Sequence, residues 1–246
     1  DPSHHQEFTQ IEYYVAYQDY EWNMDFTEKL LRDVLQKTFG KLQFEVIGKT
    51  GSIHTIDLSQ PIPRYSITDL IKQKTGIDVL EFTEAKDLAQ VMQAKNIPVD
   101  DIDKKGIGTL IDELYKHSVR PNLVAPCFIT KHTTEMKPLA RRNNQDPRLA
   151  DSFQLVIAGW EVLNAYSELV DPIDQSERMA RQAEFRAAGD EESFELDEDY
   201  IRAMEMGFPP ITGWGMGIDR IFALLTGQSN LRDIIFFPIM KPENQP

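Results

Sequence analysis

The sequence predicts an α+β fold, in which an antiparallel β-sheet is flanked by helices. Strand-like and helical segments follow one another without the regular alternation that builds a parallel sheet. Because 41% of the 246 residues are hydrophobic, the chain can form a substantial core. Residues 66–122 differ from the rest, since they read as short helices separated by polar links. We therefore expect a core made of residues 1–65 and 123–246, with a small helical insertion at residues 66–122.

The first core segment is predicted to contain a strand, a helix and a hairpin. Residues 8–17 are rich in aromatic side chains and are typical of a buried strand. An apolar stripe then indicates a helix with Asn23 as its N-cap and Gly40 at its end. Two strand-like runs flank the sequence GKTGS, at residues 42–47 and 53–58. The GKT is not a P-loop, because Gln43 stands where the first glycine is required and a strand follows, so a hairpin turn is predicted.

The predicted insertion contains helices whose starts carry capping signals. Ser66 and Asp69 form a capping pair at the first of them. Thr83 is predicted to cap a second helix, which continues through Ala94. The pattern predicts a third helix at residues 107–117.

The second core segment returns to strands before two more helices. Strand patterns occupy residues 123–130, 153–158 and 161–169. Asp171 is a strong N-cap, because a proline and an acid follow it, and its helix is predicted to reach Gly189. The acidic run at residues 189–200 lacks the ligand spacing of a calcium loop, so we expect a solvated loop that leads into a short helix.

Charge and cysteine content exclude several classes of protein. A net charge of −14 argues against a module that tracks nucleic-acid phosphates by itself, because such affinity comes from clustered Lys and Arg. The single cysteine, Cys127, excludes an internal disulfide and a cysteine-based zinc cluster, and is expected to be a buried hydrophobe. No apolar run approaches the roughly 18 residues of a membrane span. We expect a cytoplasmic protein without membrane contact, and a chain that is one piece of a longer protein.

The segment GWGMGIDR, residues 213–220, carries the clearest sign of a ligand site. Gly213, Gly215 and Gly217 alternate, so one face of an extended segment has no side chains and a flat ligand can lie on it. A helix is predicted over residues 218–226, with Arg220 in its first turn. This arrangement suggests a nucleotide site, although glycines alone also fit a tight strand–helix junction without a ligand. The dinucleotide fingerprint does not fit the spacing.

Polar residues alternate along the predicted strand at residues 161–169. Asn164, Tyr166 and Glu168 share one face, and Glu161 joins them only if a bulge or strong twist occurs near Leu163. Carboxylates on a sheet face indicate a metal ion or an ammonium group as the expected partner, whereas the alternative is a wetted edge strand.

The same pattern recurs in the first predicted strand. Glu12 and Tyr14 lie on one face there, together with Phe8. If the two strands converge, their two carboxylates, amide and phenol suit a substrate that carries an ammonium group, because a buried charge must be paired.

Several segments, in order along the chain, resemble the C-terminal catalytic part of class II lysyl-tRNA synthetases over essentially the full length. Residues 4–12 resemble the second half of motif 2, and residues 213–220 with 230–238 resemble motif 3. Residues 128–130, 138–141 and 164–169 resemble segments that are specific to the lysyl enzymes.

The resemblance implies activation of L-lysine by ATP to lysyl-adenylate, with Mg²⁺ as cofactor, and transfer to tRNA(Lys). Phe8 would stack on adenine, and Arg220 would bracket the ring and reach the terminal phosphates. The residues that the resemblance assigns to ATP are His4, Phe8, Glu161, Gly215, Gly217 and Arg220. Of these, His4, Glu161 and Arg220 are the expected catalytic residues, with Glu161 holding magnesium. Catalysis would come from positioning and charge neutralisation, without a side-chain nucleophile.

The resemblance also implies a lysine pocket. Its expected members are Glu12, Tyr14, Asn164, Tyr166 and Glu168. Aspartyl and asparaginyl enzymes of the same subclass carry an arginine where this chain has Glu168, so the carboxylate favours an ammonium side chain. Gln154 stands where the family usually has a second metal-binding carboxylate, and we expect the number or affinity of the metal ions to differ accordingly.

Other parts of such an enzyme are expected upstream of Asp1: motif 1, the motif 2 arginine and the anticodon-binding domain. We expect a homodimer for the full-length protein, since motif 1 normally builds that interface, and poor activity for residues 1–246 alone. Two alternatives stay open from the sequence. One is a paralogue that attaches a lysine-type amino acid to an elongation-factor protein, and the other is a synthetase-like module that binds ligands without turnover.

Overall fold

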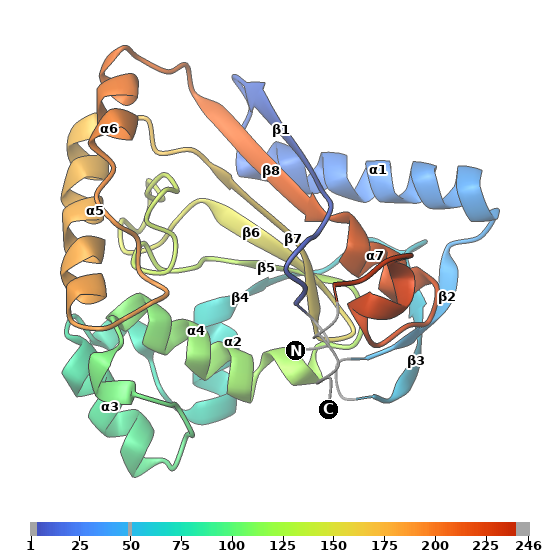
Figure 1. Cartoon of the computed structure of the whole chain (residues 1–246), viewed down its shortest axis with the longest axis horizontal. Coiled ribbons are helices and arrows are strands. Elements are labelled where there is room, and N and C mark those ends of the chain that lie inside the picture. Colours follow the sequence, from blue (N-terminus) through green and yellow to red (C-terminus); the bar gives the residue numbers. More distant parts are fainter. Residues whose placement is uncertain (1–3, 49–50, 240–246) are drawn as a thin grey trace, which may run out of the picture.

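The computed structural model describes residues 4–48 and 51–239. Within these ranges, one six-stranded sheet has the order β1-β8-β7-β6-β5-β4, and a separate hairpin pairs β2 with β3 (Figure 1). The strands are β1 Gln10–Ala16, β2 Gln43–Ile47, β3 Ile53–Asp57, β4 Arg64–Ser66, β5 Cys127–Thr130, β6 Ser152–Ile157, β7 Trp160–Ser167 and β8 Ile211–Gly217. All neighbours in the large sheet are antiparallel except β4 and β5, which are parallel. The predicted α+β class is confirmed, with one short parallel edge strand that the sequence pattern did not indicate.

Helices cover both faces of the sheet. The α-helices are α1 Tyr20–Phe39, α2 Ile67–Thr75, α3 Ala85–Ala94, α4 Ile107–Ser118, α5 Pro172–Ala187, α6 Glu198–Glu205 and α7 Ile218–Leu225. Short 3₁₀ helices span Val79–Glu81, Ile102–Lys104, Arg120–Asn122 and Leu231–Ile234. No helix in the described ranges combines the length and the apolar character that a membrane span requires.

One face of the sheet packs against α1, α7 and the β2–β3 hairpin. Its core contains Phe128, Phe153 and Trp214, all nearly inaccessible to solvent. The Trp214 ring stacks on Tyr13 at a centroid distance of 4.8 Å, and its indole N–H donates to Thr27 Oγ1 on α1 at 2.7 Å. These contacts fix the back of β8, so the opposite face of that strand is held in place for a ligand.

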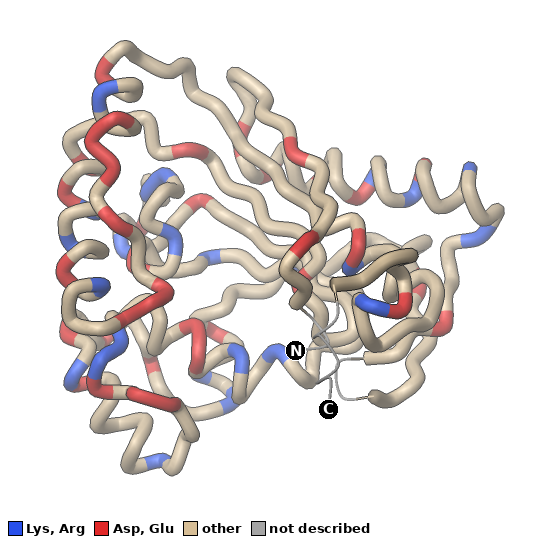
Figure 2. The backbone as a smooth tube through the Cα atoms, in the orientation of Figure 1, with Lys and Arg blue, Asp and Glu red and all other residues tan. Residues whose placement is uncertain are grey.

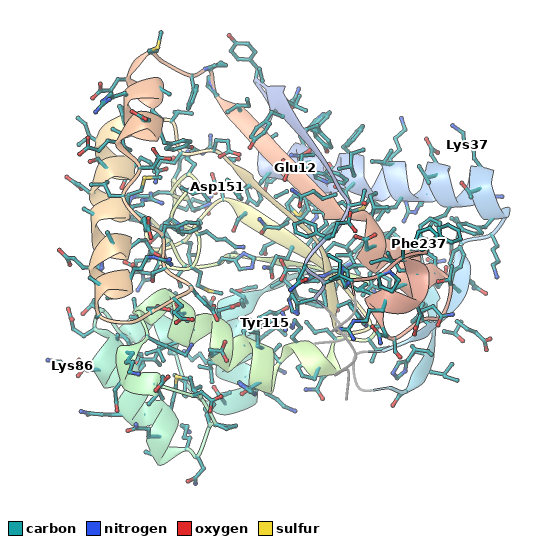
Figure 3. The ribbon with its side chains drawn as sticks, viewed as in Figure 1. Glu12, Lys37, Lys86, Tyr115, Asp151 and Phe237 are labelled. Carbon is teal, nitrogen blue, oxygen red and sulfur yellow. The ribbon has the colours of Figure 1, made fainter. Side chains whose placement is uncertain are left out.

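The opposite face is only half covered by apolar packing. Helices α2, α3 and α4 form a second hydrophobic cluster with Cys127, Ile129 and Val156 of β5 and β6. Cys127 is buried as predicted, and burial raises its pKa to about 12. Figure 3 labels Tyr115, a buried residue of α4 in this cluster. The remaining strands on this face carry the polar residues described below.

Two of the predicted helix starts are wrong. Helix α1 begins after Asp19, whose carboxylate accepts from Trp22 N at 2.9 Å. Asn23 is instead fully buried within α1, where it accepts from the Tyr13 hydroxyl at 2.7 Å and donates to Thr212 Oγ1 at 2.8 Å. An asparagine in a cap position and one that cross-links a core look alike in sequence, because the partners come from distant strands.

Helix α3 has Glu84 as its N-cap, without a side-chain capping bond, so the predicted cap at Thr83 is also wrong. The Thr83 carbonyl instead accepts from the Arg181 guanidinium at 3.3 Å. The caps at Ser66 and Asp171 are confirmed, since each side chain accepts a backbone N–H of its helix.

Some strand boundaries differ from those predicted. The strand predicted at residues 123–130 is limited to β5, and a 3₁₀ helix at residues 120–122 precedes it. β7 ends at Ser167, and Glu168 follows it in an isolated bridge with Ala140. The first strand, β1, is largely exposed rather than buried, because it lies at the edge of the sheet and pairs with β8 alone within the described residues.

Two loop predictions are confirmed by the structure. The GKTGS turn is closed by a backbone bond from Gly48 N to Ser52 O at 2.8 Å, while residues 49–50 lie outside the described ranges. The acidic run at residues 189–200 is largely a loop that leads into α6, and Asp and Glu positions are frequent along this part of the backbone (Figure 2).

Candidate functional site

The three alternating glycines of β8 form the floor of a cavity. β8 lies between β1 and β7, and residues that pair directly across strands point to the same face. Gly213 pairs with Tyr14 on β1 and with Tyr166 on β7. Gly215 pairs with Glu12 on β1 and with Asn164 on β7. Polar side chains therefore rise on both sides of a bare strip of backbone. Glu12 lies on the β1 side of it (Figure 3).

Gly213 is required by the side chains above it. A Cβ at this position would collide with Glu168 Oε1 and would lie 2.8 Å from Tyr14 Cε1. A Cβ at Gly215 would meet Glu12 Cγ at 3.7 Å, which is ordinary contact. The glycine at 213 thus makes room for Glu168 and Tyr14 to approach the sheet.

The resulting cavity has a volume of about 330 Å³. Its lining includes nearly all of the predicted ATP and lysine residues: Phe8, Glu12, Tyr14, Glu161, Asn164, Tyr166, Glu168, Gly215, Gly217 and Arg220. His4 lines an adjoining cavity instead. The structure therefore brings together residues from three separate segments of the chain, 8–14, 161–168 and 213–220.

Glu168 is the most perturbed acid in the cavity. Its Oε1 atom is buried and has no hydrogen-bond partner among the described residues. Burial raises the pKa of this carboxyl from 4.5 to about 8. A buried carboxylate without a partner is unfavourable, so this position calls for a cationic ligand.

Phenols surround this acid. Burial raises the pKa of Tyr14, Tyr166 and Tyr200, and the charge of Glu168 raises each of them further. Tyr200 comes from α6, and the sequence analysis did not single it out. The phenols therefore stay protonated and can act as hydrogen-bond donors beside the carboxylate.

Glu161 reaches the polar face through a β-bulge. In the pairing of β6 with β7, Leu155 faces Leu163 and Val156 faces Glu161, so Val162 is the extra residue. The condition stated for Glu161, a bulge or strong twist near Leu163, is therefore met by this bulge. It places Glu161 on the face that carries Asn164, where both line the cavity.

Arg220 lies between the two cavities and is held by the bulge. One guanidinium nitrogen donates to the backbone carbonyl of Glu161 at 2.7 Å, and the other lies 3.4 Å from His4 Nε2. Phe8 is 60% exposed at the mouth of the glycine-floored cavity. An exposed ring and a fixed guanidinium are both groups that can pack on an aromatic base.

The adjoining cavity, of about 450 Å³, shares Glu161 and Arg220 with the first. It is lined in addition by Arg120, Lys137 and Gln154. Arg120 Nη1 lies 3.9 Å from Glu161 Oε2. Sequence reasoning missed Arg120 and Lys137, because no local pattern marks either residue. Arg120 follows the end of α4, and Lys137 lies in a loop that packs against that helix.

Lys137 connects the two cavities. Its ammonium donates to Asn164 Oδ1 at 2.7 Å, which leaves Asn164 Nδ2 to donate elsewhere. Burial lowers the pKa of Lys137, while Glu161 and Asp112 oppose this effect. The lysine is therefore close enough to Glu161 to share its electrostatic field.

Gln154 pairs with Asn164 across β6 and β7 and is only 5% exposed. Within the described residues, its Oε1 makes no well-formed hydrogen bond, and neither does His132 Nε2. The two side chains are nonetheless near enough for Gln154 to raise the pKa of the imidazole, against the stronger lowering by burial and by Lys137. Gln154 thus places a neutral amide, and no charged group, in the lining of the cavity.

The donor set for a divalent ion is small. In the part of the chain that the structure describes, no three His, Cys, Asp or Glu side chains gather closely enough to hold a metal. Mg²⁺ commonly binds one or two carboxylates and completes its shell with phosphate oxygens and water. Glu161 therefore fits one ion shared with a nucleotide, whereas the residues do not fit an ion held by protein groups alone.

Comparison with known proteins agrees with this geometry. The family of class II tRNA synthetases (D, K and N) matches residues 1–241. Similar curated proteins include the lysine–tRNA ligase of Thermosipho africanus, 44% identical over 97% of this chain and 46% of the relative. The lysine–tRNA ligases of Porphyromonas gingivalis and of a Synechococcus species are 42% and 40% identical, over 99% and 98% of this chain and 41% and 48% of the relatives. The chain thus spans about half the length of these relatives, and it belongs to the class II tRNA synthetases of the D, K and N group.

Proposed function

We propose that this chain is the lysine- and ATP-binding part of a catalytic domain, and that the full-length protein forms lysyl-adenylate there and transfers the lysyl group to tRNA(Lys). The observation that carries the proposal is Glu168, a carboxylate with a buried, unpartnered oxygen beside Glu12 and Tyr14. An ammonium group would supply the missing partner. The similar proteins are named as lysine–tRNA ligases, which supports the same substrate.

The pocket also explains discrimination within the family. An aspartate side chain would place a second negative charge against Glu168, and an asparagine would leave that carboxylate unpaired. Sites built around a buried polar group reject ligands that lack the matching group much more strongly than sites that measure apolar size alone. Lysine is therefore the favoured member of the D, K and N group.

For the nucleotide, we assign adenine to the space between Phe8 and Arg220, over Gly215 and Gly217. His4 and Arg220 would then face the phosphates, and Glu161 would hold Mg²⁺ there. The ion, when bound, would neutralise phosphate charge. Asn164 Nδ2, left available by Lys137, is placed to donate to the lysine carboxylate.

The reaction needs no side-chain nucleophile. A carboxylate oxygen of lysine attacks the α-phosphorus and forms the acyl–phosphate bond, while the bond to the β-phosphate breaks and pyrophosphate leaves with its electrons. The residues listed above hold the two substrates in line and balance charge, which is where this class of reaction gains its rate.

The test is amino-acid-dependent exchange of pyrophosphate with ATP by the full-length protein. We expect exchange with lysine and none with aspartate or asparagine. Exchange without an amino acid, or only with aspartate, would contradict the assignment. Acceptor assays with tRNA(Lys) and with an elongation-factor protein then separate a tRNA ligase from the paralogue, and we expect the tRNA to be charged. We further propose that the full-length protein is a homodimer, which sedimentation can check.

A further inference from the structure

Two cations of this chain lie beside Glu161 in the place where phosphates would arrive. Arg120 Nη1 is 3.9 Å from the Glu161 carboxylate. Lys137 lines the same cavity and donates to Asn164 across the bulge. Arg220 completes this group from the opposite wall. These three cations and Lys116 therefore line the cavity, in which Glu161 is the carboxylate that the sheet contributes and Asp112, Glu135 and Glu192 are the other acids.

The loop that carries Lys137 is held on both sides. Before it, α4 approaches so closely that a Cβ at Gly108 would collide with the backbone of Glu135. After it, the Arg178 guanidinium donates to Ala140 O at 2.8 Å, and Gln175 donates to Pro138 O at 3.2 Å. The ammonium is therefore positioned by the fold and does not hang on a mobile surface loop.

Gln154 also disfavours a second metal ion, because its side chain is neutral where such an ion would need a charged ligand. Its side chain lines the cavity and its buried Oε1 lies near His132, so Gln154 contributes an amide but no charge at this point. A second divalent ion at this point would meet a neutral amide and the positive charge of Lys137. Both features oppose such an ion.

We propose that Lys137, with Arg120, acts as a built-in cation that binds the phosphates in place of a second divalent metal ion. The inference rests on the proposed function, since it concerns how the same site holds ATP. It assigns Lys137 as a phosphate-binding residue and limits the site to one divalent ion, at Glu161. The loss of a carboxylate at Gln154 and the presence of Lys137 are then two parts of one arrangement.

The first measurement is the number of Mn²⁺ ions bound by the full-length protein with β,γ-methylene-ATP and lysine, followed by electron paramagnetic resonance. We expect one ion per site in the wild type. The double variant Lys137→Met with Gln154→Glu removes the fixed cation and restores a carboxylate, and we expect it to bind two. Two ions in the wild type would overturn the inference.

The second measurement is the affinity for the same ATP analogue in excess chelator. Lys137→Met should weaken this metal-free binding by about 10- to 100-fold, as expected for the loss of a charged hydrogen bond. Lys137→Arg should retain most of it, which separates charge from packing. Lys131→Met is the matched control, because Lys131 is an exposed lysine in the same loop. Equal metal-free affinity in the wild type and in Lys137→Met would contradict the proposal.

Failure of the two proposals can be told apart. If the full-length protein shows lysine-dependent exchange but holds two Mn²⁺ ions, only the built-in cation is wrong. If it neither binds the analogue nor exchanges pyrophosphate, the proposed function fails and this inference fails with it.

Discussion

Replacing Glu168 by glutamine should change how the stability of the ligand-free protein depends on pH. Burial raises the pKa of this carboxyl from 4.5 to about 8. The unfolded chain restores the ordinary pKa, so between these two values the folded state binds a proton that the unfolded state has lost. The free energy of unfolding therefore falls as the pH rises through this window, and the loss is complete above about pH 8.

The size of the effect follows from the shift. At about 1.4 kcal/mol per pKa unit, this single group lowers the stability of the wild type by about 3 kcal/mol between about pH 5.5 and about pH 8.5. Glu168→Gln cannot ionise, so it should lose this contribution and be the more stable protein at alkaline pH. The burial of Glu168 thus lowers the stability of the ligand-free protein, and it leaves a carboxylate that a cationic ligand can pair with.

Urea denaturation at a series of pH values, without lysine, measures the effect. The quantity of interest is the difference between the wild type and the variant, because other titrating groups cancel. Glu12→Gln is the matched control, since it removes an exposed carboxylate from the same pocket and should leave the pH dependence close to that of the wild type. Parallel pH profiles for the wild type and Glu168→Gln would refute the reasoning.

Three further outcomes are expected. The affinity for lysine, measured by calorimetry, should rise about 50-fold from about pH 6 to about pH 8 as Glu168 ionises, and a flat profile would contradict this. Gly213→Ala should weaken lysine binding by at least about tenfold, because the added Cβ would displace Glu168. Gly215→Ala should have a smaller effect, and an equal loss of lysine affinity in titrations of the two variants would be inconsistent with the packing. Asp174→Ala should lower the free energy of unfolding by about 3 kcal/mol, because it leaves the buried Arg178 without its carboxylate, and unchanged denaturation would exclude that role.

The site was predictable where chemistry follows local periodicity. Glycines alternate in β8 and polar residues alternate in β7, so the sequence indicated which face of each strand belongs to the site. In the structure, the two strands pair with Asn164 opposite Gly215. The parity of Glu161 showed that a bulge or a strong twist was needed to bring it to this face, and the structure has the bulge. Patterns of period two carry this information without any knowledge of distant contacts.

What could not be predicted depends on contacts between distant segments. Asn23 has the sequence context of a cap, yet its two partners lie on strands separated from it by up to 189 residues. Nothing in the sequence distinguishes Lys137 from other loop lysines. It reaches Asn164 because α4 packs closely at Gly108 and because Arg178 donates to the Ala140 carbonyl in the same loop. A single sequence does not show which loop residues such packing will carry into a site.

The distribution of charge across the cavity orients its ligand. In a chain with a net charge of −14, the positive groups around Glu161 stand out, while the unpaired carboxylate of Glu168 lies at the other end of β7. Asn164 lies between them, and Lys137 holds its oxygen so that its N–H₂ is left for a negative group. A lysine bound in the reverse direction would place its side-chain ammonium against Lys137 and its carboxylate against Glu168. Both contacts would be repulsive, so in the proposed complex the charges that favour lysine would also direct its carboxylate toward the phosphates.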